Sequence, residues 1–95
     1  MKQKYISGRE KVKKAIIEIV KNKKDKGVKP VFATVGDIIS HTRMYISNVN
    51  YELSMLRSSG AIKQVEHWEE IKPFRTYNWS WGYIIADAKW KDCKE

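Results

Sequence analysis

The chain has 95 residues, of which 42% are hydrophobic, and its 19 Lys and Arg against 11 Asp and Glu give a net charge of +8. This length supports one small core, and the apolar content is too high for a disordered chain. The single cysteine, Cys93, excludes an internal disulfide framework, and no apolar run approaches the roughly 20 residues of a membrane span. Because the start of the chain also lacks the apolar segment of a secretory signal, we expect a cytoplasmic protein that does not enter a membrane.

The basic excess lies entirely in the first third of the chain. Residues 1–30 contain eleven basic and three acidic side chains, whereas residues 31–95 contain eight of each. A lysine-rich segment of this kind is either a solvated helix face or a surface that attracts nucleic acid. We favour the second interpretation.

The first predicted element is a helix from Arg9 to about Asn22. Ser7, followed three residues later by Glu10, has the pattern of a capping box. Apolar residues then recur at helical spacing, namely Val12, Ala15, Ile16, Ile19 and Val20. A short bridging strand is expected at residues 31–33.

Two further helices are predicted next. Thr34 with Asp37 forms a second capping pattern, which starts a short helix that ends near His41. The apolar residues of the following helix are separated by three, four and three positions, so they form one stripe: Ile46, Val49, Leu53 and Leu56. This helix is expected to end at residues 58–60, where Gly60 can adopt the left-handed closing conformation.

After Gly60 the apolar period falls to about two, which predicts two strands joined by a turn around Pro73. Aromatic residues alternate on one side of the second strand, namely Tyr77, Trp79, Trp81 and Tyr83. These rings are either a stacking platform for single-stranded nucleic acid or the apolar side of the hairpin, and in so small a domain we favour packing on the helices. Gly82 is expected to end the hairpin, and residues 83–95 to form a short C-terminal helix.

This order of elements resembles the winged helix-turn-helix family of DNA-binding proteins, in particular the small regulators of archaea, viruses and plasmids. The residues that carry the resemblance are Thr34–Gly60, then Ala61-Ile62 and a wing that closes at residues 77–79. The turn at residues 41–45 departs from the family pattern because it lacks the frequent glycine. The resemblance implies an α+β fold in which the third helix lies in the DNA major groove and the wing follows the backbone or enters the minor groove. Residues 1–95 would then be a single winged-helix domain, with its core at 9–82.

The polar face of the third helix is the predicted reading surface. If the apolar stripe faces the core, a rotation of about 100° per residue points short hydrogen-bonding side chains outward. Such side chains can approach base edges, and Asn can pair with adenine through two hydrogen bonds. The alternative is an ordinary polar or interaction face. The predicted base-reading residues are Arg43, Ser47, Asn48, Asn50, Tyr51 and Ser54.

Phosphate contacts are expected from the basic side chains, although three acids in the first wing strand weigh against contact along the wing. The predicted backbone-contacting residues are Lys11, Lys13, Lys14, Lys21, Lys23, Lys24, Lys72 and Arg75. A homodimer is expected to form through apolar residues near the two ends of the chain. The predicted interface residues are Tyr5, Ile84, Ile85, Ala88 and Trp90.

The sequence contains no glycine-rich phosphate loop and no nucleophile–histidine pairing with a recognisable spacing, so we do not expect an enzyme, and we expect no metal, cofactor or small-molecule ligand. We expect a sequence-specific binder of double-stranded DNA that regulates transcription as a homodimer. Two alternatives stay open: a winged-helix interaction module in a transcription or replication assembly, and a nonspecific nucleic-acid binder that acts through its lysines alone.

Overall fold

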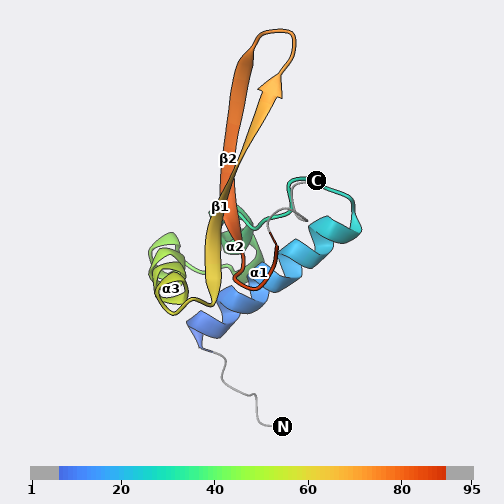
Figure 1. Cartoon of the computed structure of the whole chain (residues 1–95). Coiled ribbons are helices and arrows are strands. Elements are labelled where there is room, and N and C mark those ends of the chain that lie inside the picture. The colour runs from blue at the N-terminus through green and yellow to red at the C-terminus, as the bar shows by residue number, and fades with distance from the viewer. Residues whose placement is uncertain (1–6, 90–95) are drawn as a thin grey trace.

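The computed structural model describes residues 7–89 and shows an α+β arrangement of three helices and a two-stranded antiparallel sheet (Figure 1). The helices are α1 (Gly8–Asp25), α2 (Val35–Thr42) and α3 (Ile46–Ser58). They surround the base of a hairpin formed by β1 (Ile62–Ile71) and β2 (Thr76–Ile85), whose far end projects away from them (Figure 1). Among these described helices, none has both the length and the apolar character that crossing a membrane requires.

The predicted helix starts are confirmed. The Ser7 hydroxyl accepts a hydrogen bond from the Glu10 backbone N–H at 3.2 Å. At the start of α2 the Thr34 hydroxyl accepts from the Asp37 N–H at 3.0 Å, and the Asp37 carboxylate accepts from the Thr34 N–H at 3.1 Å. These bonds satisfy amide groups that a helix leaves unpaired in its first turn.

The core lies between the three helices and the base of the hairpin, and it contains most of the apolar residues predicted from helical spacing. The stripe of α3 begins at Val49, however, and Ile46 is 60% exposed. Ile46 is the first residue of α3, and a helical side chain leans toward the N-terminal end of its helix. Its side chain therefore points past the end of α3 instead of into the core.

The hairpin runs in continuous register from Ile62 opposite Ile85 to Ile71 opposite Thr76. The predicted bridging strand is a single bridge, in which the Ala33 N–H donates to the Tyr83 carbonyl at 2.9 Å and the Tyr83 N–H donates to the Ala33 carbonyl at 2.8 Å. The base of β2 is thus hydrogen-bonded on both sides.

The predicted C-terminal helix is wrong within the described residues. Residues 83–85 are the last part of β2, and residues 86–88 form turns. Gly82 does not end the strand but lies within β2, at a point where Phe32 and Ala33 pass so close that a side chain at position 82 would clash with them. Residues 90–95 lie outside the described residues.

Of the predicted dimer interface, the structure excludes Ile84, and the rest stays a prediction. Ile84 is fully buried and packs with Phe32 and Val65, since β2 carries it into the core. Ile85 and Ala88 are half-buried against the same cores. Two further residues of the predicted interface, Tyr5 and Trp90, lie outside the described residues.

The prediction that the alternating aromatic rings pack on the helices holds for only half of them. Tyr83 is buried and Trp81 is half-buried, whereas Trp79 is 45% and Tyr77 63% exposed. The reason is the length of the hairpin, which carries its outer half beyond the helices (Figure 1). The molecule measures 57 Å along its longest axis and 27 and 23 Å across.

A lysine on α1 stabilises the start of α2 through two hydrogen bonds. The Lys23 ammonium donates to the Asp37 carboxylate at 2.7 Å and to the Phe32 carbonyl at 2.9 Å. Partial burial acts to raise the pKa of the Asp37 carboxyl, but hydrogen bonds from Lys23 and Thr34 outweigh it, so this pKa lies below its ordinary value of 3.8. The ionised carboxylate therefore stabilises the folded state.

This lowered pKa predicts a loss of stability in acid. The unfolded chain binds the Asp37 proton more readily, so the stabilisation is complete above the ordinary pKa and is lost as the pH falls through the lower folded pKa. We expect Asp37→Asn to lower the free energy of unfolding by about 0.5–1 kcal/mol at pH ~7, a modest loss because the carboxylate is partly exposed. Urea unfolding of both proteins from pH ~7 to ~2.5 measures this difference, which should shrink below pH ~4. If the difference in the free energy of unfolding stayed constant over this pH range, the negative charge of Asp37 would not be what stabilises the folded state.

Candidate nucleic-acid interface

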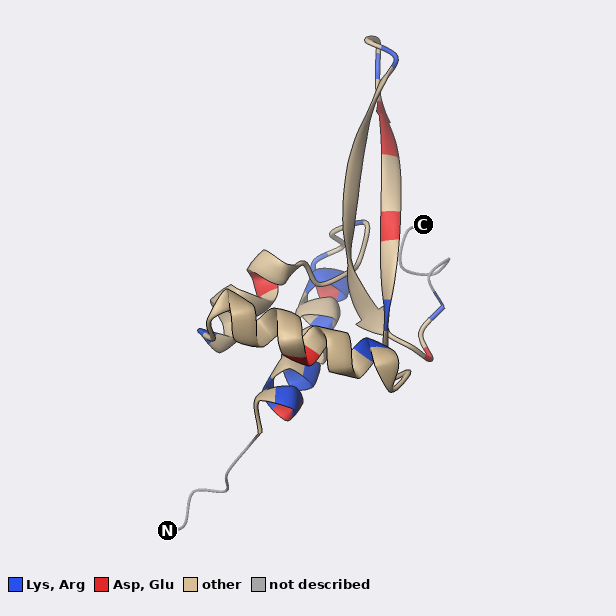
Figure 2. Ribbon diagram, turned by 90° about the vertical axis from the view of Figure 1, so that its left-hand side faces the viewer, with Lys and Arg blue, Asp and Glu red and all other residues tan. Residues whose placement is uncertain are grey.

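The polar side of α3 is uncovered. The side chains predicted to face away from the core are all exposed, and within residues 7–89 none of them is held by a hydrogen bond of its own. They are Ser47, Asn48, Asn50, Tyr51 and Ser54. In Figure 2 α3 lies in front of α1, and its ribbon is mostly tan because Glu52 and Arg57 are its only charged residues. The outward orientation is therefore confirmed, and the role in reading bases remains a prediction.

The opposite side of α3 is anchored by Val49, Leu53 and Leu56, and also by a buried acid that the sequence analysis missed. Glu52 is 9% exposed, and its carboxylate lies 3.4 Å from the guanidinium of Arg9 on α1. Its position three residues after Val49 places it on the apolar stripe, which is the signal that could have identified it. This pair helps to fix α3 against α1, so the exposed face has a defined direction.

The turn between α2 and α3 places a cation at the start of the reading face. Arg43 adopts a left-handed conformation with a φ of 58°, and its N–H donates to the Ile39 carbonyl at 2.7 Å. Arg43 thus occupies the left-handed position for which a glycine is usual in such turns. Tyr45, which precedes α3, is 81% exposed and was missed because the sequence leaves the length of this turn open.

Two of the predicted lysines lie close to this turn. Lys11 and Lys14 line a hollow of about 260 Å³ together with Ala15, His41 and Thr42. Thr42 is the last residue of α2 and directly precedes Arg43. The structure therefore brings three exposed cations, Lys11, Lys14 and Arg43, to the end of α2 that leads into α3.

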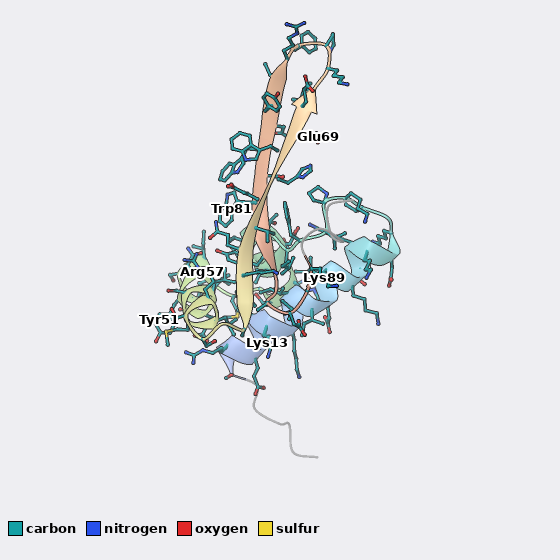
Figure 3. The ribbon with its side chains drawn as sticks, viewed as in Figure 1. Lys13, Tyr51, Arg57, Glu69, Trp81 and Lys89 are labelled. Carbon is teal, nitrogen blue, oxygen red and sulfur yellow. The ribbon has the colours of Figure 1, made fainter. Side chains whose placement is uncertain are left out.

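The remaining lysines of α1 are not gathered beside α3. Figure 1 shows that the second half of α1, which carries Lys21, Lys23 and Lys24, runs away from α3. Lys21 and Lys24 are exposed there, whereas Lys23 is held by Asp37 and Phe32. Lys23 is thus engaged within the protein, and the predicted phosphate-binding cluster divides into two groups. Lys13 is exposed on α1 (Figure 3).

A second hollow lies directly beside the reading face. It measures about 190 Å³ and is lined by Gly8, Met44, Asn48, Tyr51 and Glu52. Asn48 and Tyr51 therefore share one edge of α3, next to the first residue of α1. Two side chains of the predicted reading face that can form hydrogen bonds therefore line this hollow.

At the other end of α3, Arg57 connects the helix to the hairpin. Its guanidinium donates to the side-chain carbonyl of Gln64 on β1 at 2.9 Å. Figure 3 shows Arg57 on the side of α3 that faces the hairpin, while Trp81 extends from the hairpin on the side of α3. Arg57 was missed by the sequence analysis, although a basic residue in the last turn of a helix is a recognisable signal.

The tip of the hairpin is basic and apolar, and the strand that leads to it is acidic. Lys72 and Arg75 are exposed on either side of Phe74, which is 74% exposed. Figure 2 shows basic residues at the tip, acidic bands along one strand and no charge along the other. The acidic residues are Glu66, Glu69 and Glu70. Contact with a polyanion is therefore favourable at the tip and unfavourable along β1.

No model of a protein family, no curated protein and no solved structure was found to match this chain. Its function therefore has to be inferred from the geometry of the surface described above.

Proposed function

We propose that the protein binds double-stranded DNA selectively by placing α3 in the major groove. The observation that carries this proposal is the exposed face of α3, which is almost uncharged, is polar apart from Met55 and, at its start, Ile46, and has cations at both ends. Lys11, Lys14 and Arg43 lie near its start, and Arg57 lies near its end. The major groove admits an α-helix, and short hydrogen-bonding side chains on that helix can reach the base edges.

The arrangement of the elements supports a winged helix-turn-helix fold. Three helices are followed by a hairpin, and β2 pairs both with β1 and with Ala33, which lies between α1 and α2. In this proposal α2 and α3 are the helix-turn-helix and the hairpin is the wing. The simplest biological role is then regulation of transcription, by occupying a short DNA site.

The side chains divide into two roles. Asn48, Asn50 and Tyr51 would contact base edges, because they are exposed on the outer face of α3. Lys11, Lys14 and Arg43 would contact phosphates on one side of the groove, which orients the protein but carries no sequence information. The second lysine group on α1 would add only nonspecific attraction.

The proposal is tested by selecting duplexes from a random library and comparing the selected duplex with a scrambled one in fluorescence anisotropy titrations. At ~150 mM salt we expect the selected duplex to bind about 10³-fold more tightly. Equal affinities that vanish as salt rises would contradict the proposal and indicate a nonspecific binder. No duplex binding at low or high salt would contradict it as well and favour a protein-interaction module.

A further inference from the structure

The outer part of the hairpin, residues 66–81, carries a row of aromatic rings that is exposed except at Trp81, and we call this part the arm. Trp68 and Trp79 are cross-strand partners with ring centroids 6.1 Å apart, and Trp79 lies 6.3 Å from Trp81. Trp68 is 60% exposed. A two-stranded hairpin is only marginally stable in water unless another element covers it. Within residues 7–89 Trp81 packs against the core, and beyond Trp81 no element covers the arm (Figure 1).

The two edges of the arm differ in charge. The outer edge of β1 carries acidic residues, which natural proteins use to prevent unwanted strand pairing. β2 contains no charged residue over its ten positions. Its outer edge therefore lacks the protection that the β1 edge has.

The backbone of β2 presents free hydrogen-bonding groups along this edge. The N–H and C=O of Tyr83 point away from β1, because both bond to Ala33. Alternate residues of a strand direct these groups to the same side, so those of Trp81, Trp79 and Tyr77 point to the same edge. Among the described residues, the bridge to Ala33 occupies only the base of this edge and leaves the arm unpaired.

We propose that this free edge of β2 pairs antiparallel with the same edge of a second copy, which joins two hairpins into a four-stranded sheet. Pairing centred on Trp79 places Tyr77 opposite Trp81 of the second copy and forms about six backbone hydrogen bonds. A two-fold axis through that centre, perpendicular to the sheet, leaves the aromatic faces of both arms on the same side. The tryptophan rows of the two copies then lie side by side and shield the edges that face each other.

The charges of the arm are compatible with this partner. Residues 66–81 contain three acids and two bases, whereas the basic excess of the chain lies in residues 1–30, outside the arm. A nucleic acid fits the aromatic face less well, because Glu66 and Glu70 lie on that face and the Glu66 carboxylate accepts the Trp79 indole N–H at 3.1 Å. Carboxylates at this position repel phosphates. The inference does not depend on the proposed binding of DNA.

The test places charges where the two copies would meet. Asn78 and Ser80 lie on the other face of β2, and in the proposed register each lies opposite the other residue of the second copy. Asn78→Lys with Ser80→Lys would set like charges directly opposite, whereas Asn78→Lys with Ser80→Glu would set opposite charges there. Within one hairpin Asn78 is the partner of Glu69, so a lysine at position 78 does not disturb the fold.

Sedimentation velocity of the full chain from ~1 to ~200 μM measures the outcome. We expect the wild-type chain to dimerise, the double-lysine variant to dimerise at least tenfold more weakly, and the lysine–glutamate variant to regain wild-type affinity. Glu69→Gln, on the other strand, should leave dimerisation unchanged. A wild-type chain that stays monomeric over this range, or a double-lysine variant that dimerises as tightly as wild type, would overturn the proposal.

Discussion

Gly82→Ala is expected to lower the free energy of unfolding by about 3 kcal/mol, near the upper end of what overpacking a core costs. A Cβ at this position would lie 2.6 Å from the Phe32 ring and 2.7 Å from the Ala33 carbonyl oxygen. The oxygen belongs to the backbone that bonds to Tyr83, so it cannot move without breaking that bridge. For a domain whose total stability is about 5–15 kcal/mol, this loss is large.

Gly36→Ala is the matched control for this substitution. Gly36 lies within α2, and the nearest atom to an added Cβ is the Thr34 hydroxyl at 3.8 Å. Alanine is a better helix former than glycine, so we expect no loss and a gain of up to about 1 kcal/mol. Urea unfolding of both variants beside the wild type measures the contrast. If Gly82→Ala were as stable as the wild type, the crossing of Phe32 and Ala33 over β2 would be wrong.

The elements predicted correctly from the sequence are those that depend on neighbouring residues. Ser7 and Thr34 mark helix starts because a cap acts over three residues, and the apolar stripe of α3 follows from helical geometry alone. The outward direction of Asn48 and Tyr51 follows from the same geometry. These predictions required no knowledge of how distant segments pack.

The predictions that fail depend on contacts between distant segments. Gly82 was expected to end a strand because glycine weakens strands, but Phe32 and Ala33, about fifty residues earlier, require a glycine there. Lys23 was expected to contact phosphate, but Asp37 on the next helix holds it. The grouping of the other lysines depends on the angle between α1 and α3, which a charge pattern does not encode.

Asn48→Ala combined with Tyr51→Ala should remove most of the discrimination between DNA sequences. If α3 reads bases, each lost hydrogen-bonding contact costs about 1–3 kcal/mol on the selected duplex. We expect that duplex to bind about 10²-fold more weakly, while the affinity for a scrambled duplex changes less than about threefold. Both side chains are exposed, so the free energy of unfolding should be unaffected.

A variant that lacks three lysines should lose affinity for both duplexes and keep the discrimination between them. Lys13→Ala, Lys21→Ala and Lys24→Ala together remove exposed charges on α1 and leave Lys23, which stabilises α2, in place. We expect this triple variant to bind selected and scrambled duplexes more weakly by the same factor, with a shallower dependence on salt. Anisotropy titrations of both variants at several salt concentrations separate the two effects.

If the Asn48 and Tyr51 double variant kept the full ratio between its affinities for the two duplexes, the exposed face of α3 would not be the reading surface. The polar character of that face would then have to be explained by contact with another protein.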